Sequence, residues 1–172
     1  MAREGTKVVT HAVAPATMPV REITWSEIER LVGILLAKIP DGYDNILVIT
    51  RGGMVPACLI SERTNMRNIL CAAAIMYDGT ERRRTEPIFM QFPSDDQVSG
   101  RRILVVDDVW DTGGTIVEVR DRLRHAGGIV DTCVLHFKPT HNRFPGDGPE
   151  FHAEETAGWI VYPWDASRPL AG

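Results

Sequence analysis

The pattern of apolar and polar positions predicts an early helix. Apolar residues recur at three- and four-residue spacing from about Ser26 to Lys38, which indicates a helix with one apolar face. Thr24 and Glu27 have the spacing of a capping box at its start, and Pro-Asp-Gly at residues 40–42 stops it. The first regular element is therefore expected to be an amphipathic helix.

Beyond this helix, short apolar runs alternate with helical patterns. We expect strands at Asn45–Thr50, Ile69–Tyr77, Arg102–Val106 and Val130–Phe137, with shorter ones at Ile88–Phe92 and Trp159–Tyr162. Further helices are expected at about Pro56–Arg63 and Thr115–His125. Strands that alternate with helices predict an α/β fold with a central, mostly parallel, twisted sheet flanked by helices. In such sheets, ligands bind beyond the carboxyl ends of the strands.

Two stretches show no periodicity. Residues 1–20 contain two prolines, and we interpret them as a mobile N-terminal arm. Residues 139–157 form a long polar segment without a period. Because 172 residues suit one domain with a substantial core, we expect a single domain over residues 21–166 and a C-terminal tail at 167–172.

Composition and charge exclude several classes of protein. The formal net charge is −4 and the pI is about 5.7, which argues against a nucleic-acid binder with a basic face. Three widely spaced cysteines without a CxxC pair argue against a disulfide framework or a structural zinc site. His141 and His152 lie near two glutamates, but their spacing fits no standard set of metal ligands. No apolar run reaches the length of a membrane span and the start lacks a signal-peptide core, so we expect a cytoplasmic location.

The sharpest chemical signal is the run RILVVDDVWDTGGT at residues 102–115. Apolar residues deliver Asp107 and Asp108 to the end of a strand, and a glycine turn follows Asp111 and leads into a helix. Backbone amides at such a turn, with the positive end of the helix dipole, suit a phosphate. Two carboxylates nearby would repel that phosphate unless they faced sugar hydroxyls or a metal. The run therefore predicts a sugar-phosphate site.

Simpler explanations cover only part of this run. A solvated acidic strand end followed by a tight turn would account for the Asp-Asp pair alone, but not for the whole pattern. No lysine follows the glycines, so the loop is not a Walker A motif, and no GxGxxG is present.

The segment VVDDVWDTGGT resembles the signature with which type I phosphoribosyltransferases bind phosphoribosyl pyrophosphate (PRPP). The resemblance covers about residues 22–166 and implies that family's fold. That fold has a small hood, here the N-terminal helix region with residues 139–166, and a flexible lid loop. The resemblance also implies that Asp107 and Asp108 contact the ribose hydroxyls.

The same resemblance assigns roles to the loop after the acidic pair. The 5′-phosphate would be wrapped by Asp111, Thr112, Gly113, Gly114 and Thr115. Asp111 also resembles the family's candidate general base, which lies near N7 of a purine.

The turn of Arg51, Gly52 and Gly53 lies between a predicted strand and a helix. A structural turn would explain it alone, but paired glycines also let a backbone approach a ligand closely. By resemblance this turn is the pyrophosphate loop, and we predict a non-proline cis peptide bond between Arg51 and Gly52. The arginine-rich segment Tyr77–Asp96 falls where the family has its lid, with Met76 where purine enzymes often have serine. A solvated surface loop is the alternative interpretation of that segment.

Lys138 and the segment Trp159–Asp165 resemble features of the bacterial xanthine–guanine phosphoribosyltransferases. Alone, the lysine would be a surface charge and the tryptophan a core residue. By resemblance, Lys138 donates to the purine 6-oxo group, Trp159 stacks on the base, and the Ile160 backbone meets the base edge. Asp165 would help to hold magnesium.

The resemblance implies a Mg²⁺-dependent enzyme that transfers ribose 5-phosphate from PRPP to N9 of a 6-oxopurine, namely guanine, xanthine or hypoxanthine. Its partners would be PRPP and a purine base, with no nucleic acid or membrane, and it would act in purine salvage as a homodimer or homotetramer. The alternatives are a pyrimidine or orotate phosphoribosyltransferase and a non-catalytic regulator that senses PRPP. The roughly 20 residues before the first helix are too few for a DNA-binding winged helix.

Overall fold

The computed structural model describes residues 19–75 and 88–165. Most of the expected N-terminal arm, the tail from residue 166, and residues 76–87 of the expected lid lie outside this range. The described strands are β1 (Val20–Glu22), β2 (Asn45–Thr50), β3 (Ile69–Ile75), β4 (Ile88–Gln91), β5 (Arg102–Trp110), β6 (Ile129–Phe137), β7 (Phe151–Glu155) and β8 (Trp159–Val161). The described helices are α1 (Trp25–Leu36), α2 (Met54–Thr64), α3 (Asp95–Val98) and α4 (Gly114–His125).

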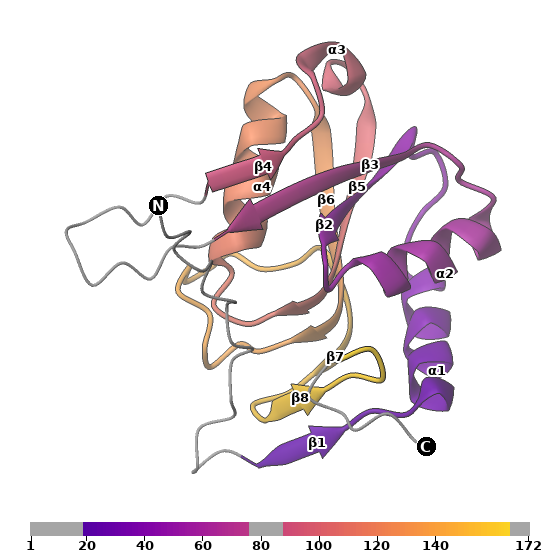
Figure 1. The fold of residues 1–172 in the computed structure, drawn as a ribbon, viewed down its shortest axis with the longest axis vertical. Helices are drawn as coiled ribbons and strands as arrows, with labels where there is room; N and C mark the ends of the chain where they lie inside the picture. The colour runs from indigo at the N-terminus through magenta and orange to yellow at the C-terminus, as the bar shows by residue number, and fades with distance from the viewer. Residues whose placement is uncertain (1–18, 76–87, 166–172) are drawn as a thin grey trace, which may run out of the picture.

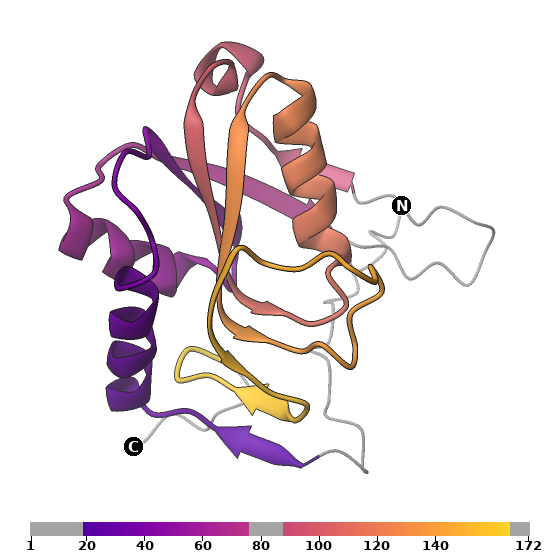
Figure 2. The ribbon, with the colours of Figure 1, turned by 180° about the vertical axis from the view of Figure 1, so that it is seen from behind.

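A six-stranded sheet of order β4-β3-β2-β5-β6-β7 forms the centre of the fold (Figure 1). All neighbouring strands pair in parallel except β3 and β4, which are antiparallel. The core residues of α1 and α2 pack on one face of the sheet, and those of α3 and α4 on the other (Figure 2). The predicted α/β fold with a mostly parallel sheet flanked by helices is therefore confirmed.

Alternate residues of the central strands supply the two cores. In β2, Ile46 and Val48 belong to the core under α1 and α2, whereas Leu47 and Ile49 belong to the core under α4. All four side chains are buried because helices cover both faces of the sheet. This explains why the central strands have almost continuous apolar sequences.

The first helix starts where its capping box predicts. The backbone N–H of Glu27 donates to Thr24 Oγ1 at 3.2 Å, and the backbone N–H of Thr24 donates to Glu27 Oε2 at 2.9 Å. The helix ends at Leu36, slightly before the predicted Lys38. No helix in the described part of the chain is long and apolar enough to cross a membrane.

Apart from shifts of one or two residues at strand ends, three strands differ from the prediction because pairing partners, rather than periodicity, define them. Strand β5 does not end at Val106 but continues through the acidic pair to Trp110, since Val109 and Trp110 pair with the end of β6. Strand β7 lies within the segment 139–157 that has no period, and pairs with β6 at the sheet edge. Its side chains are mostly half-buried, so apolar and polar residues do not alternate.

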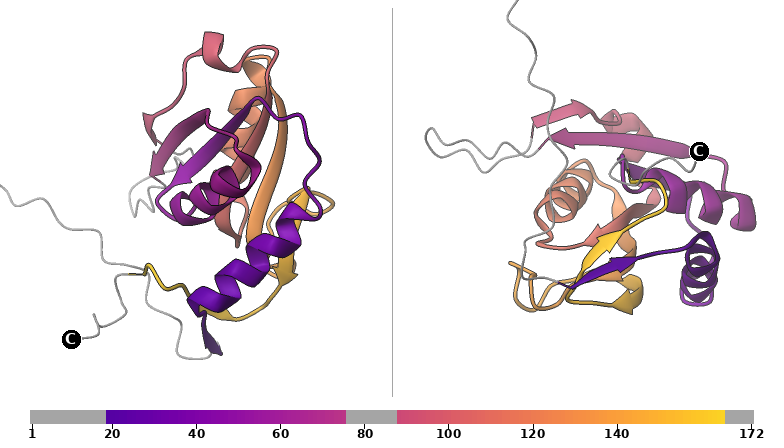
Figure 3. Two further views of the ribbon diagram at one scale, coloured as in Figure 1. Left: turned by 90° about the vertical axis from the view of Figure 1, so that its right-hand side faces the viewer. Right: turned by 60° about the horizontal axis from the view of Figure 1, so that its bottom comes forward.

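The third difference lies at the start of the described chain, where β1 includes Val20 from the expected arm. Strand β1 pairs in parallel with β8 in a separate two-stranded sheet (Figure 3). The chain continues from β8 to Tyr162, whose hydroxyl donates to the Asp108 carbonyl oxygen at 3.0 Å. This bond links the segment after β8 to β5, close to the sheet's carboxyl edge.

The turn from β2 into α2 passes so close to β5 that only glycine fits at residue 53. A Cβ there would lie 2.2 Å from the Val106 carbonyl oxygen and 2.8 Å from that of Ile49. Because both are backbone atoms, a strand or the turn would have to move. Gly53→Ala is therefore expected to lower the free energy of unfolding by roughly 3 kcal/mol, measured by denaturant unfolding.

Gly33→Ala is the matched control, since a Cβ added there, on the exposed side of α1, would have no atom within 4 Å. That change is expected to stabilise the protein by about 0.5–1 kcal/mol, because alanine favours helix. Equal stability of Gly53→Ala and the wild type would contradict the close approach.

Candidate active site

The loop that follows β2 brings Gly52 against the acidic pair of β5. The cis peptide bond lies between Thr50 and Arg51, one residue before the predicted position, so that prediction was wrong. Glycine is required at position 52 because a Cβ there would lie 2.6 Å from the Asp108 carboxyl group. The structure thus places the Arg51–Gly53 turn beside Asp108, with the Arg51 side chain exposed.

The two acids of β5 are partly buried, and neither carboxyl group is paired with a cation among the described residues. Burial and the charge of Asp108 raise the pKa of Asp107 well above its usual range. Burial and the charge of Asp165 raise the pKa of Asp108 to about 6. Asp165 lies in the turn after β8, where its Oδ2 accepts from the Tyr162 backbone N–H at 2.7 Å. The carboxyl groups of Asp107 and Asp108 in β5 and of Asp165 after β8 therefore lie near one another.

A hydrogen-bonded pair of buried rings fixes the backbone at Asp108. Because the Tyr162 hydroxyl donates its only proton to the Asp108 carbonyl, His136 Nδ1–H donates to the Tyr162 oxygen at 2.8 Å. Burial lowers the pKa of His136 to about 4, so its ring is neutral at neutral pH. Asp108 is thus held by a neutral, rigid support.

The predicted phosphate loop, residues 111–115, lines an open cavity of ≈ 100 Å³. Gly113 precedes α4 with φ +85°, a left-handed conformation, and a Cβ there would lie 2.5 Å from Trp110 Nε1. Helix α4 begins at Gly114, so its first backbone N–H groups have no partner within the helix. The cavity is lined by Asp107, Val109, Asp111, Thr112, Gly113, Gly114, Thr115 and Ile116. Free amides at a helix start, around a small cavity, suit a phosphate group.

The Trp110 side chain lies directly against Gly113 of this loop, a contact that the sequence did not predict. Its side chain is fully buried and packs edge-on against Phe137, with ring centroids 6.2 Å apart. Its Nε1–H donates to Asn142 Oδ1 at 3.1 Å. The sequence does show a large apolar residue between the acidic pair and the glycines. It does not reveal the contact, because the partner Asn142 is distant in the chain.

Lys138 forms an ion pair with Asp111, the first residue of the phosphate loop. Lys138 follows β6 and is only 3% exposed, and its Nζ donates to Asp111 Oδ2 at 2.9 Å. The same Nζ lies 5.7 Å from the centroid of the Trp159 ring. The structure therefore brings together three predicted site residues: Asp111 after β5, Lys138 after β6 and Trp159 in β8. Ile160, next to Trp159, is buried and pairs with Arg21 of β1.

His141 is a further neighbour of Asp111 that the sequence analysis weighed only as a metal ligand. Its Nδ1 lies 2.8 Å from Asp111 Oδ1, so both carboxylate oxygens have a partner. Burial acts to raise the pKa of Asp111, but the hydrogen bonds from Lys138 and His141 outweigh it, and the pKa is lowered. The pKa of Asp111 is thus shifted in the opposite direction to the pKa values of Asp107 and Asp108. No group of three or more potential metal ligands was found among the described residues.

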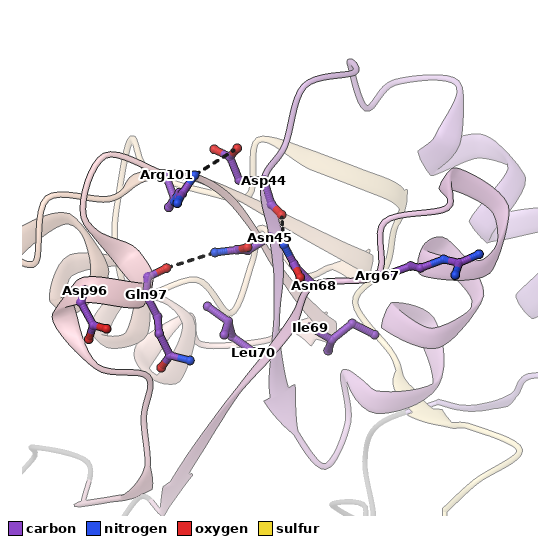
Figure 4. Close-up of a pocket in the computed structure, with 9 residues that line it drawn as sticks. All are labelled: Asp44, Asn45, Arg67, Asn68, Ile69, Leu70, Asp96, Gln97 and Arg101. Atoms are coloured by element: carbon purple, nitrogen blue, oxygen red, sulfur yellow. Dashed lines mark hydrogen bonds and ion pairs between the residues drawn. The ribbon is translucent and has the colours of Figure 1, made fainter.

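A larger cavity of ≈ 480 Å³ lies at the opposite, amino edge of the sheet (Figure 4). Some of its polar groups contact one another: Asn45 Nδ2 donates to the Gln97 carbonyl at 3.1 Å, and Arg101 lies 4.0 Å from Asp44. None of the predicted site residues lines it. The candidate site is therefore at the carboxyl edge.

The raised pKa of Asp108 predicts a pH-dependent stability. A carboxyl group with a folded pKa of about 6 and a lower unfolded value destabilises the fold progressively as pH rises between them. Asp108→Asn removes this term, so the ligand-free variant is expected to exceed the wild type in unfolding free energy by roughly 1–3 kcal/mol at pH 8. The gain should shrink towards pH 4.5, as measured by urea unfolding. A gain that is equal at both pH values would contradict this account.

Comparison with known proteins agrees with this geometry. Residues 22–169 match the phosphoribosyl transferase domain family. The chain is 33% identical to xanthine-guanine phosphoribosyltransferase of Idiomarina loihiensis, over 87% of this chain and 92% of that protein. It is 31% identical to the enzyme of the same name from Gluconobacter oxydans, over 89% of each.

Solved structures have the same fold. Purine phosphoribosyltransferase from Pyrococcus horikoshii superposes with a TM-score of 0.75 at 24% identity, covering 89% of this chain and 98% of that one. A hypothetical protein from Neisseria gonorrhoeae with bound ppGpp gives 0.73 at 25% identity, covering 89% and 93%. Because the family model covers most of the chain and two relatives are more than 30% identical over most of it, the chain belongs to the phosphoribosyl transferase domain family.

Proposed function

We propose that this protein is a purine phosphoribosyltransferase that joins ribose 5-phosphate from PRPP to N9 of a 6-oxopurine and releases pyrophosphate. The observation that carries this proposal is the buried Lys138 ammonium group, held between Asp111 and the Trp159 ring at the edge of the phosphate loop. The names of the relatives support the same reaction class.

The sugar phosphate would bind along the carboxyl end of β5. The 5′-phosphate would accept hydrogen bonds from backbone amides of residues 112–115 and from the hydroxyls of Thr112 and Thr115. Asp107 and Asp108 would accept from the ribose hydroxyls, which suits partly buried carboxyl groups without a cation. The Arg51–Gly53 turn beside Asp108 would then meet the pyrophosphate.

The purine would bind between Lys138 and Trp159. Lys138 would donate to the 6-oxo group, Trp159 would stack on the ring, and the Ile160 backbone would meet the base edge. An ammonium group selects a carbonyl oxygen over the amino group of adenine, which is a donor. Asp111, adjacent to Lys138, would accept or orient the proton on N7.

Under this proposal, one or two carboxyl groups of the site would hold magnesium together with substrate phosphates. Oxygen ligands suit Mg²⁺. A cation near Asp165 and Asp108 would offset the repulsion from Asp165, which together with burial raises the pKa of Asp108. Asp165 would help to hold the ion, and bound magnesium would neutralise charge on the pyrophosphate.

In the proposed reaction, N9 bonds to the anomeric carbon as the bond to the pyrophosphate oxygen breaks. The transition state would have oxocarbenium character, so the chain's contribution is mainly positioning of the two substrates. Asp107 and Asp108 would fix the ribose, and the phosphate loop would fix its 5′ end. Lys138 and Asp111 would orient the purine.

We further propose that residues 21–166 act as one domain, with residues 139–166 and the N-terminal helix region as its hood. The lid would close over the substrates, and the protein would act as a homodimer or homotetramer in the cytoplasm. The support is that β1, β8 and the turn with Asp165 adjoin the carboxyl end of β5.

The direct test is a spectrophotometric assay with PRPP, Mg²⁺ and six bases: guanine, xanthine, hypoxanthine, adenine, uracil and orotate. We expect turnover of at least one 6-oxopurine and discrimination against adenine on the order of 10⁴-fold. Asp111→Asn should be strongly impaired. Turnover of a pyrimidine instead, or tight PRPP binding without turnover of any base, would overturn the proposal and favour the corresponding alternative.

Lys138→Met tests the recognition of the 6-oxo group. Loss of a charged hydrogen bond should lower kcat/KM for the 6-oxopurine about 10- to 100-fold while the KM for PRPP stays within about twofold. Lys38→Met is the matched control, because Lys38 is exposed and donates to the His152 carbonyl. Equal effects of the two variants would contradict the assignment of Lys138.

A further inference from the structure

Three consecutive residues after Lys138 return to the phosphate loop. His141 contacts Asp111, Asn142 contacts Trp110, and the Arg143 backbone N–H donates to the Thr112 carbonyl at 3.1 Å. We call residues 141–143 the return segment. Each of its residues meets a different residue of the run 110–112, so it holds the start of the phosphate loop.

The return segment is itself anchored. Asn142 Nδ2 donates to the carbonyls of Phe144 and Asp147, at 3.2 and 2.6 Å. Asp147 in turn accepts from Arg120 of α4, with one N···O distance of 2.8 Å. The Arg120 guanidinium is almost completely buried, so this pair joins the return segment firmly to the helix that follows the phosphate loop. His141 therefore extends from a fixed backbone.

Asp111 needs a second hydrogen-bond donor, besides Lys138, to keep its carboxylate oriented towards a purine. Its Oδ2 accepts from Lys138, which under the proposed function must also donate to the purine 6-oxo group. His141 lies on the other oxygen, Oδ1, at 2.8 Å. Because a carboxylate only accepts, the Nδ1 of His141 carries the proton of this bond, and Nε2 is not needed for it.

We propose that His141 is a positioning residue: its Nδ1–H holds Asp111 Oδ1, so that Oδ2 stays directed to the bound purine when Lys138 turns to the 6-oxo group. This inference rests on the proposed function of Asp111. His141 touches Asp111 and acts through it.

The charges around Asp111 define the pH response. Lys138 at the end of β6 and His141 of the return segment face its carboxylate, and Asp107 of β5 lines the same cavity. The hydrogen bonds from Lys138 and His141 both lower the pKa of Asp111. Removal of the His141 donor should therefore move the titration of Asp111 to higher pH.

The test compares His141→Ala and His141→Asn in the full chain. The asparagine amide can occupy the place of Nδ1 and donate to Oδ1. We expect His141→Ala to lower kcat with the accepted 6-oxopurine about tenfold, with the KM for PRPP within about twofold, since one charged hydrogen bond is lost. His141→Asn should recover most of kcat. His125→Ala, at the exposed end of α4, is the control and should match the wild type.

A second readout does not depend on turnover. The Asp111 carboxyl group is titrated by ¹³C NMR, and assigned by its absence in Asp111→Asn. The expected result is a higher pKa in His141→Ala than in the wild type. If the wild type turns over no base, the proposed function fails, and this titration still decides whether His141 holds Asp111.

Two results would overturn the inference. One is an active wild type with kcat and the Asp111 titration unchanged in His141→Ala. The other is a loss of kcat that His141→Asn does not recover and that accompanies equal losses of PRPP affinity and Tm, which would show a structural role only. Asn142→Ala provides the contrast: loosening Trp110 beneath Gly113 should raise the KM for PRPP more than it lowers kcat.

Discussion

The ion pair between Lys138 and Asp111 is the interaction on which the site depends. A lysine that is 3% exposed requires a partner, because a buried charge without one costs several kcal/mol. Asp111 supplies it at 2.9 Å and thereby ties the end of β6 to the loop that follows β5. The same pair places an ammonium group, a carboxylate and the Trp159 ring close together, and under the proposed function these groups would receive a purine with a 6-oxo group.

The carboxyl groups along β5 and its loop divide into two kinds. Asp111 has two donors and a lowered pKa, so it remains an anion. Asp107 and Asp108 are adjacent and partly buried, and burial, together with neighbouring carboxyl groups, raises the pKa values of both. Such a contrast between nearby acids is typical of sites with separate chemical roles. It also means that the charged forms of Asp107 and Asp108 are disfavoured in the ligand-free site, and under the proposed function sugar hydroxyls and a metal would stabilise them.

Rigid support explains how a short loop can hold this arrangement. Trp110 fills the space beneath Gly113, Tyr162 and His136 fix the backbone at Asp108, and Arg120 anchors the segment that bonds to Trp110. All four supporting side chains are buried. The phosphate loop therefore has its shape before any ligand binds, as expected of a site whose main contribution is positioning.

The sequence by itself determined the α/β class, the order of most elements, the capping box of α1 and the glycine turn that leads into α4. These features depend on local spacing, which periodicity, caps and glycine turns report directly. Tertiary structure alone decided the extension of β5 to Trp110, the strand β7, and the position of the cis bond at Thr50–Arg51. It also decided the pairing of His141 with Asp111, 30 residues away, and of Trp110 with Asn142. Such contacts join segments that are distant in the chain, and no local pattern records a partner that only the folded sheet brings near.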